Sequence, residues 1–247
     1  MKRIIPVILI SAQTLSFVGC DMQDDSRRDE DDEEVVLSEE EMLQEATDLS
    51  IEALYNAADN NEVRAESTYL DNYYTVMGYV SDIDDEEIRL SSLTDRGYID
   101  VTLPSDDIID LDSNQVITVV GRLSDLDEMD VAYLVDDELT VEAEVGWTSI
   151  MVTSGYGTRA DRKGVFYLTL AGGEQVICEF ASSETGIHTY GTTGTALHPG
   201  TFDTLKINDV EVYEGDRFEL SGTAYYVNGT PYDYIEFDYG STVTPVD

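Results

Sequence analysis

The sequence has few positively charged residues and a large excess of negatively charged ones. Thirteen Lys and Arg residues stand against 53 Asp and Glu residues in a chain of 247, which gives a formal net charge of −40. Proteins that bind nucleic acid or anionic lipid head groups use lysine and arginine to neutralise phosphates. We therefore expect no nucleic-acid partner. The charge suits a cationic partner, or a salty medium that screens repulsion between carboxylates.

Cysteine and histidine are also scarce, with two of each. A structural zinc site needs four clustered ligands, and His188 and His198, ten residues apart, fall short of that. Cys178 lies in the alternating segment QVICEF, which predicts a buried free thiol. The acidic stretches 110–114 and 125–130 lack the glycine of a calcium loop and read as solvated turns. With no nucleophile-elbow motif either, the sequence predicts no metal, no cofactor and no enzymatic activity.

Residues 1–19 have the pattern of a signal peptide. A positively charged start precedes the apolar run Ile4–Ile10, which is too short to span a bilayer. The segment Phe17-Val18-Gly19-Cys20 that follows resembles the bacterial lipobox. The resemblance implies that Cys20 is lipidated and becomes the first residue of a protein anchored to a membrane of the bacterial cell envelope. It leaves open which membrane and which side. The alternative is an ordinary secretory signal followed by a chance cysteine.

Residues 20–37 form an acidic block without aromatic residues. Such a block buries too little apolar surface to fold, so we expect a solvated spacer between the anchor and the folded part of the chain.

The region 38–146 predicts a helix followed by a small barrel. Ser38 and Glu41 have the spacing of a capping box, and apolar residues recur at helical spacing to about Ala58, where Asp59-Asn60-Asn61 ends the helix. From Tyr73 the pattern changes to five strand-like segments, with a short helix predicted at 105–111 between the third and fourth. The segments are YYTVMGYVSDI, EIRLSSL, YIDVTLP, QVITVVGRLSDL and VAYLVDDELTV. This order predicts a five-stranded OB-fold.

One nine-residue pattern occurs twice in this region. Residues 76–84 read VMGYVSDID and residues 119–127 read VVGRLSDLD, identical at five of nine positions. These segments are the predicted first and fourth strands, which are paired neighbours in an OB-fold. Gly78 and Gly121 would then allow both strands to bend and close the barrel. A solenoid would need at least three copies.

Residues 51–142 resemble the tRNA anti-like family of bacterial OB domains, many of which occur in lipoproteins. The positions that carry the resemblance are an Asn-Glu-x-x-Ala turn, a tyrosine and a G-x-V strand: Asn61, Glu62, Ala65, Tyr69, Gly78 and Val80. The resemblance implies an OB-fold and an envelope setting. The family name reflects fold similarity to anticodon-binding domains and implies no RNA binding.

Residues 147–247 predict a mainly β second domain, either OB-like or a small β-sandwich. Asn228-Gly229 indicates a hairpin between its last two strands. In the final strand Ile235 and Phe237 should face the core, which places Tyr232 and Tyr234 on the outer face. Stacking tyrosines on an OB surface form a candidate ligand surface. The alternative is that they cap the barrel with their hydroxyls in water.

These features predict a mainly β, membrane-anchored envelope lipoprotein. We expect a non-catalytic binding module for a protein, peptide or glycan. The alternative is a structural envelope protein with no small ligand, and an enzyme is the least favoured reading.

Overall fold

The computed structural model describes most of the chain from residue 37 onward. The described ranges are 37–94, 96–136, 138–154, 157–180, 205–207, 210–230, 232–238 and 240–246. The predicted signal peptide, Cys20, residues 20–36 of the predicted spacer and both histidines lie outside the described residues. Within them, no helix is both long enough and apolar enough to cross a membrane.

The predicted first helix is wrong in its extent, because the structure has two helices there. α1 (Glu39–Glu45) begins with the predicted capping box, in which the Ser38 N–H donates to the Glu41 carboxylate at 3.0 Å. The chain then straightens into the short strand β1 (Thr47–Leu49). The Ser50 hydroxyl starts α2 (Ile51–Tyr69) by accepting the backbone N–H of Ala53.

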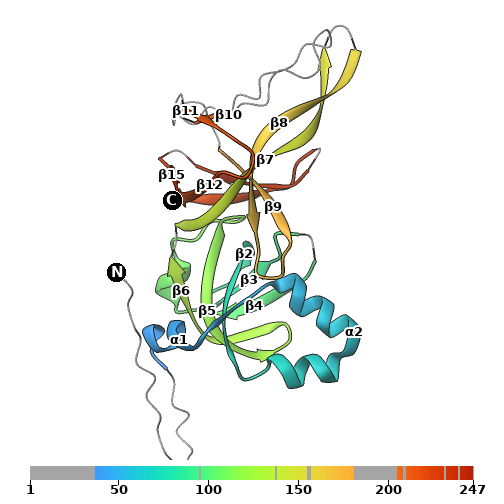
Figure 1. The fold of residues 1–247 in the computed structure, drawn as a ribbon. Helices are drawn as coiled ribbons and strands as arrows, with labels where there is room; N and C mark the ends of the chain where they lie inside the picture. The colour runs from blue at the N-terminus through green and yellow to red at the C-terminus, as the bar shows by residue number, and fades with distance from the viewer. Residues whose placement is uncertain are drawn as a thin grey trace, which may run out of the picture. The chain divides into compact units, whose positions relative to one another are not determined.

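α2 also continues beyond the predicted stop at Asn61. The backbone of Asn61 is extended there (φ −167°, ψ 93°), which kinks the helix (Figure 1). Its side-chain oxygen accepts the N–H of Arg64 at 3.1 Å. Asn61 therefore ends one helical segment and caps the next, as asparagine side chains commonly do.

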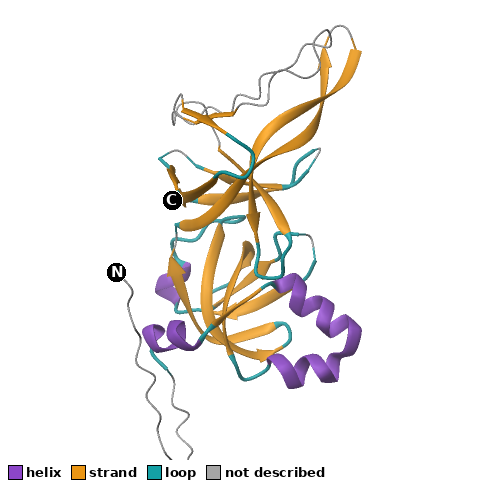
Figure 2. Ribbon diagram, in the orientation of Figure 1, coloured by secondary structure: helices purple, strands orange, loops and turns teal. Residues whose placement is uncertain are grey.

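A five-stranded barrel follows, and the predicted OB-fold is confirmed (Figures 1 and 2). Its strands are β2 (Tyr73–Ile83), β3 (Glu87–Ser91), β4 (Tyr98–Thr102), β5 (Val116–Asp125) and β6 (Glu128–Asp136). The order is β2-β3-β4-β6-β5, and β5 pairs back with β2 to close it. α3 (Ser105–Ile108) lies between β4 and β5, where a short helix is predicted.

The two strand glycines lie where neighbouring elements come very close. A Cβ atom on Gly78 would be 2.7 Å from Leu90 Cγ, and one on Gly121 would be 2.8 Å from Ala132 Cβ. The register of β5 against β6 also shifts across Gly121. The register is irregular at Gly121 but runs unbroken through Gly78 in its pairing with β5, so close packing is the feature that requires glycine at both positions.

The second half forms a seven-stranded sheet and a separate two-stranded hairpin. The sheet contains β7 (Leu139–Ser154), β8 (Gly157–Thr169), β9 (Gln175–Phe180), β12 (Arg217–Gly222), β13 (Ala224–Val227), β14 (Tyr234–Phe237) and β15 (Thr242–Pro245). The hairpin contains β10 (Leu205–Ile207) and β11 (Val210–Val212).

This sheet repeats the pairing order of the first barrel. β12 pairs with β7 and β13 pairs with β14, and only Thr223 separates β12 from β13. Taken as one interrupted strand, they complete the cycle β7-β8-β9-β14-β13/β12-β7, with β9 and β14 parallel as β4 and β6 are. The order supports the OB-like alternative over the β-sandwich.

The second sheet begins earlier than its composition suggests. β6 ends at Asp136 and β7 begins at Leu139, so the segment VAYLVDDELTV is two strands and the expected boundary at 146/147 falls within β7. β7 and β8 continue past Trp147 as a projecting hairpin. Among the described strands, the outer parts of β7 and β8 pair only with each other (Figure 1).

Residues of the first barrel pack into the core of the second. Leu93 and Val116 of the first barrel belong to the buried cluster of the second, and the Tyr226 N–H donates to the Asn114 carbonyl at 2.7 Å. Residues 36–247 form one compact unit.

Candidate functional site

The predicted tyrosine pair lies on the outer face of the second barrel. Ile235 and Phe237 are fully buried, as predicted, and Tyr232 and Tyr234 are half-buried on the opposite side. The ring centroids of the two tyrosines are 6.3 Å apart and the rings meet edge to face at 76°. This is a favourable arrangement for two aromatic rings, so the pair forms a single aromatic surface.

Glu179 of β9 holds Tyr232 in place. The Tyr232 hydroxyl donates to Glu179 Oε1 at 2.8 Å. Burial raises the pKa of Tyr232, and the hydrogen bond to the Glu179 carboxylate raises it further. Burial and the nearby Glu236 carboxylate also raise the pKa of Tyr234. Both phenols are therefore neutral hydrogen-bond donors at physiological pH.

Tyr167 of β8 extends this surface, and the sequence analysis missed it. The register places Tyr167 opposite Ile177 on β9, and Ile177 opposite Tyr234 on β14. The Tyr167 ring occupies the space above Gly146, where an added Cβ would be 2.5 Å from Tyr167 Cε2. Its hydroxyl donates to the Trp147 carbonyl at 3.2 Å. We call Tyr167, Tyr232, Tyr234 and Glu179 the tyrosine face.

Alternation in GVFYLTL marks Tyr167 as outward-facing, because it lies between the buried Phe166 and Leu168. What the sequence does not provide is its neighbours. β9 and β14 pair in parallel across more than fifty residues, and no local pattern predicts that contact.

Tyr232 lies in the loop between β13 and β14. The hairpin predicted from Asn228-Gly229 is confirmed, because β13 and β14 pair antiparallel and residues 228–233 connect them. Asp233 stabilises this loop by accepting the Gly229 N–H at 3.0 Å. OB-folds bind ligands with their second and third strands and the loop between the fourth and fifth. In the second barrel these elements are β8, β9 and residues 228–233, which carry Tyr167, Glu179 and Tyr232. Tyr234 follows as the first residue of β14.

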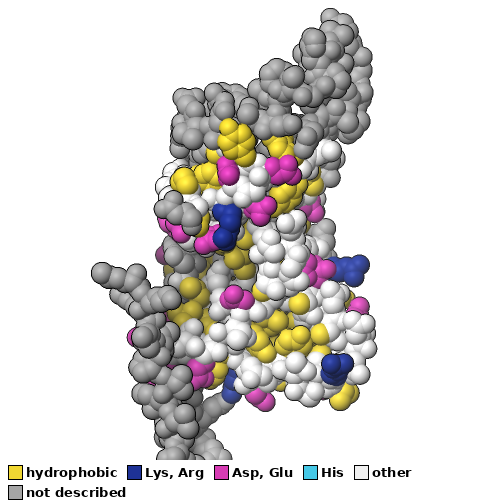
Figure 3. Space-filling view, in the orientation of Figure 1, with side chains coloured by type: hydrophobic (Ala, Val, Ile, Leu, Met, Phe, Trp, Pro, Cys, Tyr) yellow, Lys and Arg dark blue, Asp and Glu magenta, His cyan; other side chains and the backbone are white. Residues whose placement is uncertain are grey.

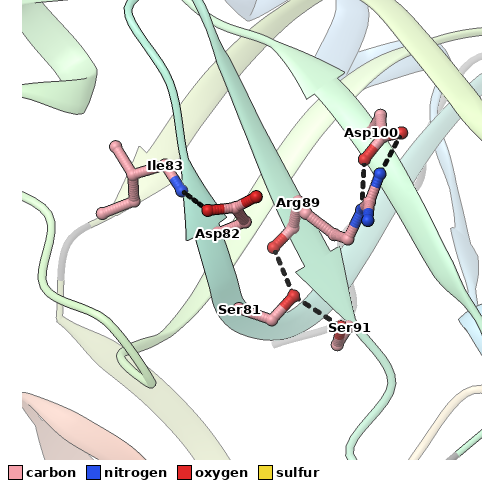
Figure 4. Close-up of polar contacts among 6 residues, drawn as sticks. All are labelled: Ser81, Asp82, Ile83, Arg89, Ser91 and Asp100. Atoms are coloured by element: carbon pink, nitrogen blue, oxygen red, sulfur yellow. Dashed lines mark hydrogen bonds and ion pairs between the residues drawn. The ribbon is translucent and has the colours of Figure 1, made fainter.

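The corresponding face of the first barrel carries a charged pair. Arg89 on β3 donates two hydrogen bonds to Asp100 on β4, at 2.8 and 3.0 Å (Figure 4). The guanidinium carbon of Arg89 lies 4.2 Å from the centroid of the Tyr98 ring. Ser81 on β2 donates to the Arg89 carbonyl and shares a hydrogen bond with Ser91.

The described part of the chain contains neither a cluster of metal-binding side chains nor a reactive thiol. No group of three or more His, Cys, Asp or Glu side chains gathers there. In the acidic stretch 110–114, Asp112 accepts the Tyr225 hydroxyl at 3.2 Å. Cys178 is free and buried, as predicted, and burial raises the pKa of its thiol to about 12. A thiol with that pKa stays protonated and unreactive in the folded protein.

Comparison with known families agrees with the first barrel. The profile of the family described as tRNA_anti-like matches residues 1–138, more than half of the chain. The chain belongs to the tRNA_anti-like family. The tRNA_anti-like match ends one residue before β7, so the second sheet and its tyrosine face lie beyond the matched region. No curated protein matches the chain.

Proposed function

We propose that this tRNA_anti-like protein is a lipid-anchored, non-catalytic binding module of the bacterial cell envelope. It holds a protein, peptide or glycan on the tyrosine face of its second barrel. The observation that carries this proposal is the grouping of Tyr167, Glu179 and Tyr232 on the elements that OB-folds use for binding, with Tyr234 of β14 beside them.

The chemistry of the face favours ligands that are uncharged or cationic. Tyrosine rings offer flat apolar surfaces beside hydroxyl groups, which suits sugar rings and proline. Hydrogen bonds to Glu179 and to the Trp147 carbonyl hold two of the rings in place, so little conformational entropy is lost on binding. Glu179 and Glu236 are direct partners in the β9–β14 register, and their charges repel the phosphates of nucleic acid.

The anchoring part of the proposal rests on the N-terminal sequence. The lipobox-like segment ending at Cys20 supports lipidation, and the acidic residues 20–37 support a spacer between the membrane and the first barrel. The scarcity of positive charge supports an attachment to the membrane through lipid and not through a basic surface.

One observation favours the structural alternative. Tyr232 already donates its hydroxyl to Glu179 and is half-buried, as expected for a tyrosine that caps a barrel without binding a ligand. In that case the protein acts as a rigid part of an envelope assembly.

Direct binding assays on the full chain would decide between the two. We would screen immobilised protein against peptidoglycan fragments, a glycan array and a peptide library. The proposal predicts a ligand whose affinity falls about tenfold or more in Tyr234→Ala, because an aromatic contact is lost. Tyr213→Ala is the matched control, since Tyr213 is exposed and is not part of β8, β9 or β14. Absence of any ligand, or equal effects of both variants, would favour the structural alternative.

A further inference from the structure

A groove runs between α2 and the first barrel, away from the tyrosine face. Its volume is about 480 Å³, which is within the range of typical ligand sites. Its lining is apolar at the base and carries two tyrosines and four carboxylates: Ile51, Leu54, Tyr55, Ala58, Asp59, Glu62, Tyr98, Asp125, Leu126 and Asp127. Figure 1 shows the elements that form it, α2 beside β4 and the turn from β5 to β6. We call it the α2 groove.

The two tyrosines are exposed although they border a groove. Tyr55 retains 47% of its accessible surface and Tyr98 retains 41%. Tyr55 packs closely over Gly97, where an added Cβ would be 3.0 Å from Tyr55 Cβ. Gly97 has a φ of 88°, a conformation that favours glycine. The turn at Gly97 therefore holds Tyr55 in a fixed place while much of its ring faces solvent.

The carboxylates lie on both sides of the groove. Asp59 and Glu62 come from α2, and Asp125 and Asp127 come from the turn between β5 and β6. The Asp125 carboxylate accepts the Leu126 N–H. No hydrogen bond or ion pair engages the side chains of Asp59, Glu62 or Asp127 within the described part of the chain. No Lys or Arg lines the groove, so its charge is uncompensated.

One guanidinium group already lies against Tyr98, although it is not among the residues that line the groove. Arg89 lies over the Tyr98 ring at 4.2 Å and donates two hydrogen bonds to Asp100. A cation over a tyrosine with a carboxylate beside it is a favourable arrangement. The groove has similar carboxylates near Tyr55 and Tyr98, namely those of Asp59, Glu62 and Asp127. No Lys or Arg among its lining residues supplies the guanidinium or ammonium group that would complete the arrangement.

We propose that the α2 groove binds a cationic polypeptide segment of a partner protein, with Lys or Arg side chains between Tyr55 and Tyr98 and the carboxylates of both sides. Charge complementarity selects this partner, because the groove has four carboxylates and no cation. Figure 3 shows the same contrast more broadly, since dark blue Lys and Arg side chains are isolated on the face it displays. Carboxylates on two opposite sides suit a chain that carries several cations along its length.

The site is separate from the tyrosine face in sequence and in structure. It is formed by α2, β4 and the β5–β6 turn, and the tyrosine face is formed by β8, β9, residues 228–233 and β14. A variant of one site therefore leaves the other in place, and either proposal can fail alone.

The test measures binding of labelled peptides to the full chain by fluorescence anisotropy at 0.15 M salt. The probes are (Gly-Arg)4, (Gly-Lys)4 and (Gly-citrulline)4, the last being a neutral analogue of the first. The groove variant combines Asp59→Asn, Glu62→Gln and Asp127→Asn. Its matched control combines Asp106→Asn, Asp110→Asn and Glu214→Gln, which removes the same charge from exposed positions outside the groove. Tyr55→Ser tests the aromatic wall separately.

We expect the groove variant to weaken binding of the cationic probes about tenfold or more, since three charged contacts are lost, and the control to weaken it less than about twofold. Tyr55→Ser should also weaken binding, and Tyr234→Ala should not change it. Equal effects of the groove and control variants would show attraction to net charge only and would overturn the proposal. Citrulline peptides binding as well as arginine peptides would overturn it too. Self-association of the wild-type chain that the groove variant abolishes, without peptide binding, would assign the groove to a second copy and not to a partner.

Discussion

Val76 on β2 and Val119 on β5 are direct partners across the antiparallel pair that closes the first barrel, and both are fully buried. Each is also the first residue of one copy of the nine-residue repeat. The two copies therefore start at one point in the barrel and run away from it in opposite directions. Gly78 and Gly121 occupy equivalent positions on either side, opposite Ile117 and Tyr74 respectively.

The later residues of the repeat make equivalent contacts as well. Ser81 donates to the Arg89 carbonyl on β3, and Ser124 donates to the Glu128 carbonyl on β6. The Asp that follows each serine accepts the N–H of the next residue, at 3.1 Å in the first copy and 2.7 Å in the second. Both strands leave the same pair and make equivalent serine and aspartate contacts as they approach the next strand, although residues 84–86 connect β2 to β3 and residues 126–127 connect β5 to β6.

Replacing Gly121 tests this account of closure. Gly121→Val should destabilise the protein by about 1–3 kcal/mol, because the new side chain would meet Ala132 and Met129 at less than contact distance. Thr75→Val is the control. It keeps the shape of a side chain on the same strand pair and should change the free energy of unfolding by less than about 0.5 kcal/mol. Urea denaturation of the full chain measures both. A Gly121→Val protein as stable as wild type would show that glycine is not needed there.

The contact between the barrels gives a second prediction. Tyr79 and Tyr226 stack with their centroids 4.2 Å apart and their planes at 5°. A double-mutant cycle of Tyr79→Ala and Tyr226→Ala should give a coupling energy of about 0.5–1.5 kcal/mol. Tyr79→Ala combined with Tyr167→Ala is the control pair, since no ring contact joins those two tyrosines, and its effects should add. Additive effects in the first pair would mean that the stacking contributes nothing to coupling the barrels.

Local patterns predicted the first barrel because its neighbours in space are mostly neighbours in sequence. The five strand segments and the short helix follow from alternation and turn residues, and the order that pairs β2 with β5 and β4 with β6 follows from the OB-fold pattern that they match. The kink at Asn61 could not be predicted in this way, because an asparagine that ends one helix and an asparagine that caps the next look alike in sequence.

The candidate site was only partly predictable for the same reason. Alternation around Ile235 and Phe237 places Tyr232 and Tyr234 on the outer face. Their partners Tyr167 and Glu179 come from strands that reach β14 through a distant parallel pairing. The α2 groove joins a helix to a turn more than sixty residues away, and no periodicity in either segment indicates that contact.

Cys20 is the residue on which membrane attachment depends in the proposed function. Cys20→Ser should move the protein from the membrane fraction to the soluble fraction, because no other residue in the lipobox-like segment accepts lipid. Fractionation followed by immunoblotting measures the change. Cys178→Ser is the matched control and should leave the protein with the membranes. A Cys20→Ser protein that still sediments with membranes as fully as wild type would disprove the anchor.

Burial of Cys178 predicts both its reactivity and a loss of stability in alkali. In the Cys20→Ser background Cys178 is the only thiol, and it should resist iodoacetamide at pH 8 until the protein is unfolded. Its folded pKa of about 12 exceeds the ordinary value of 9.0 for a thiol, so the folded state binds more protons between these values. The contribution of this group to stability is therefore fully present below about pH 9 and is lost as the pH rises toward 12. Rapid labelling of the folded protein at pH 8, monitored by mass spectrometry, would contradict the buried position.

The excess of carboxylates predicts a strong dependence of stability on salt. Folding brings 53 acidic side chains closer together than they are in the unfolded chain, with only 13 cations to offset them. The distance over which charges act falls from about 10 Å at 0.1 M salt to about 3 Å at 1 M. We expect the full chain to melt at a higher temperature in 1 M sodium chloride than in dilute buffer, as measured by circular dichroism. The groove variant, which removes three of the unpaired carboxylates, should gain less from salt than the wild type because less repulsion remains to be screened. A melting temperature that does not depend on salt would show that repulsion among these carboxylates does not limit the stability of the fold.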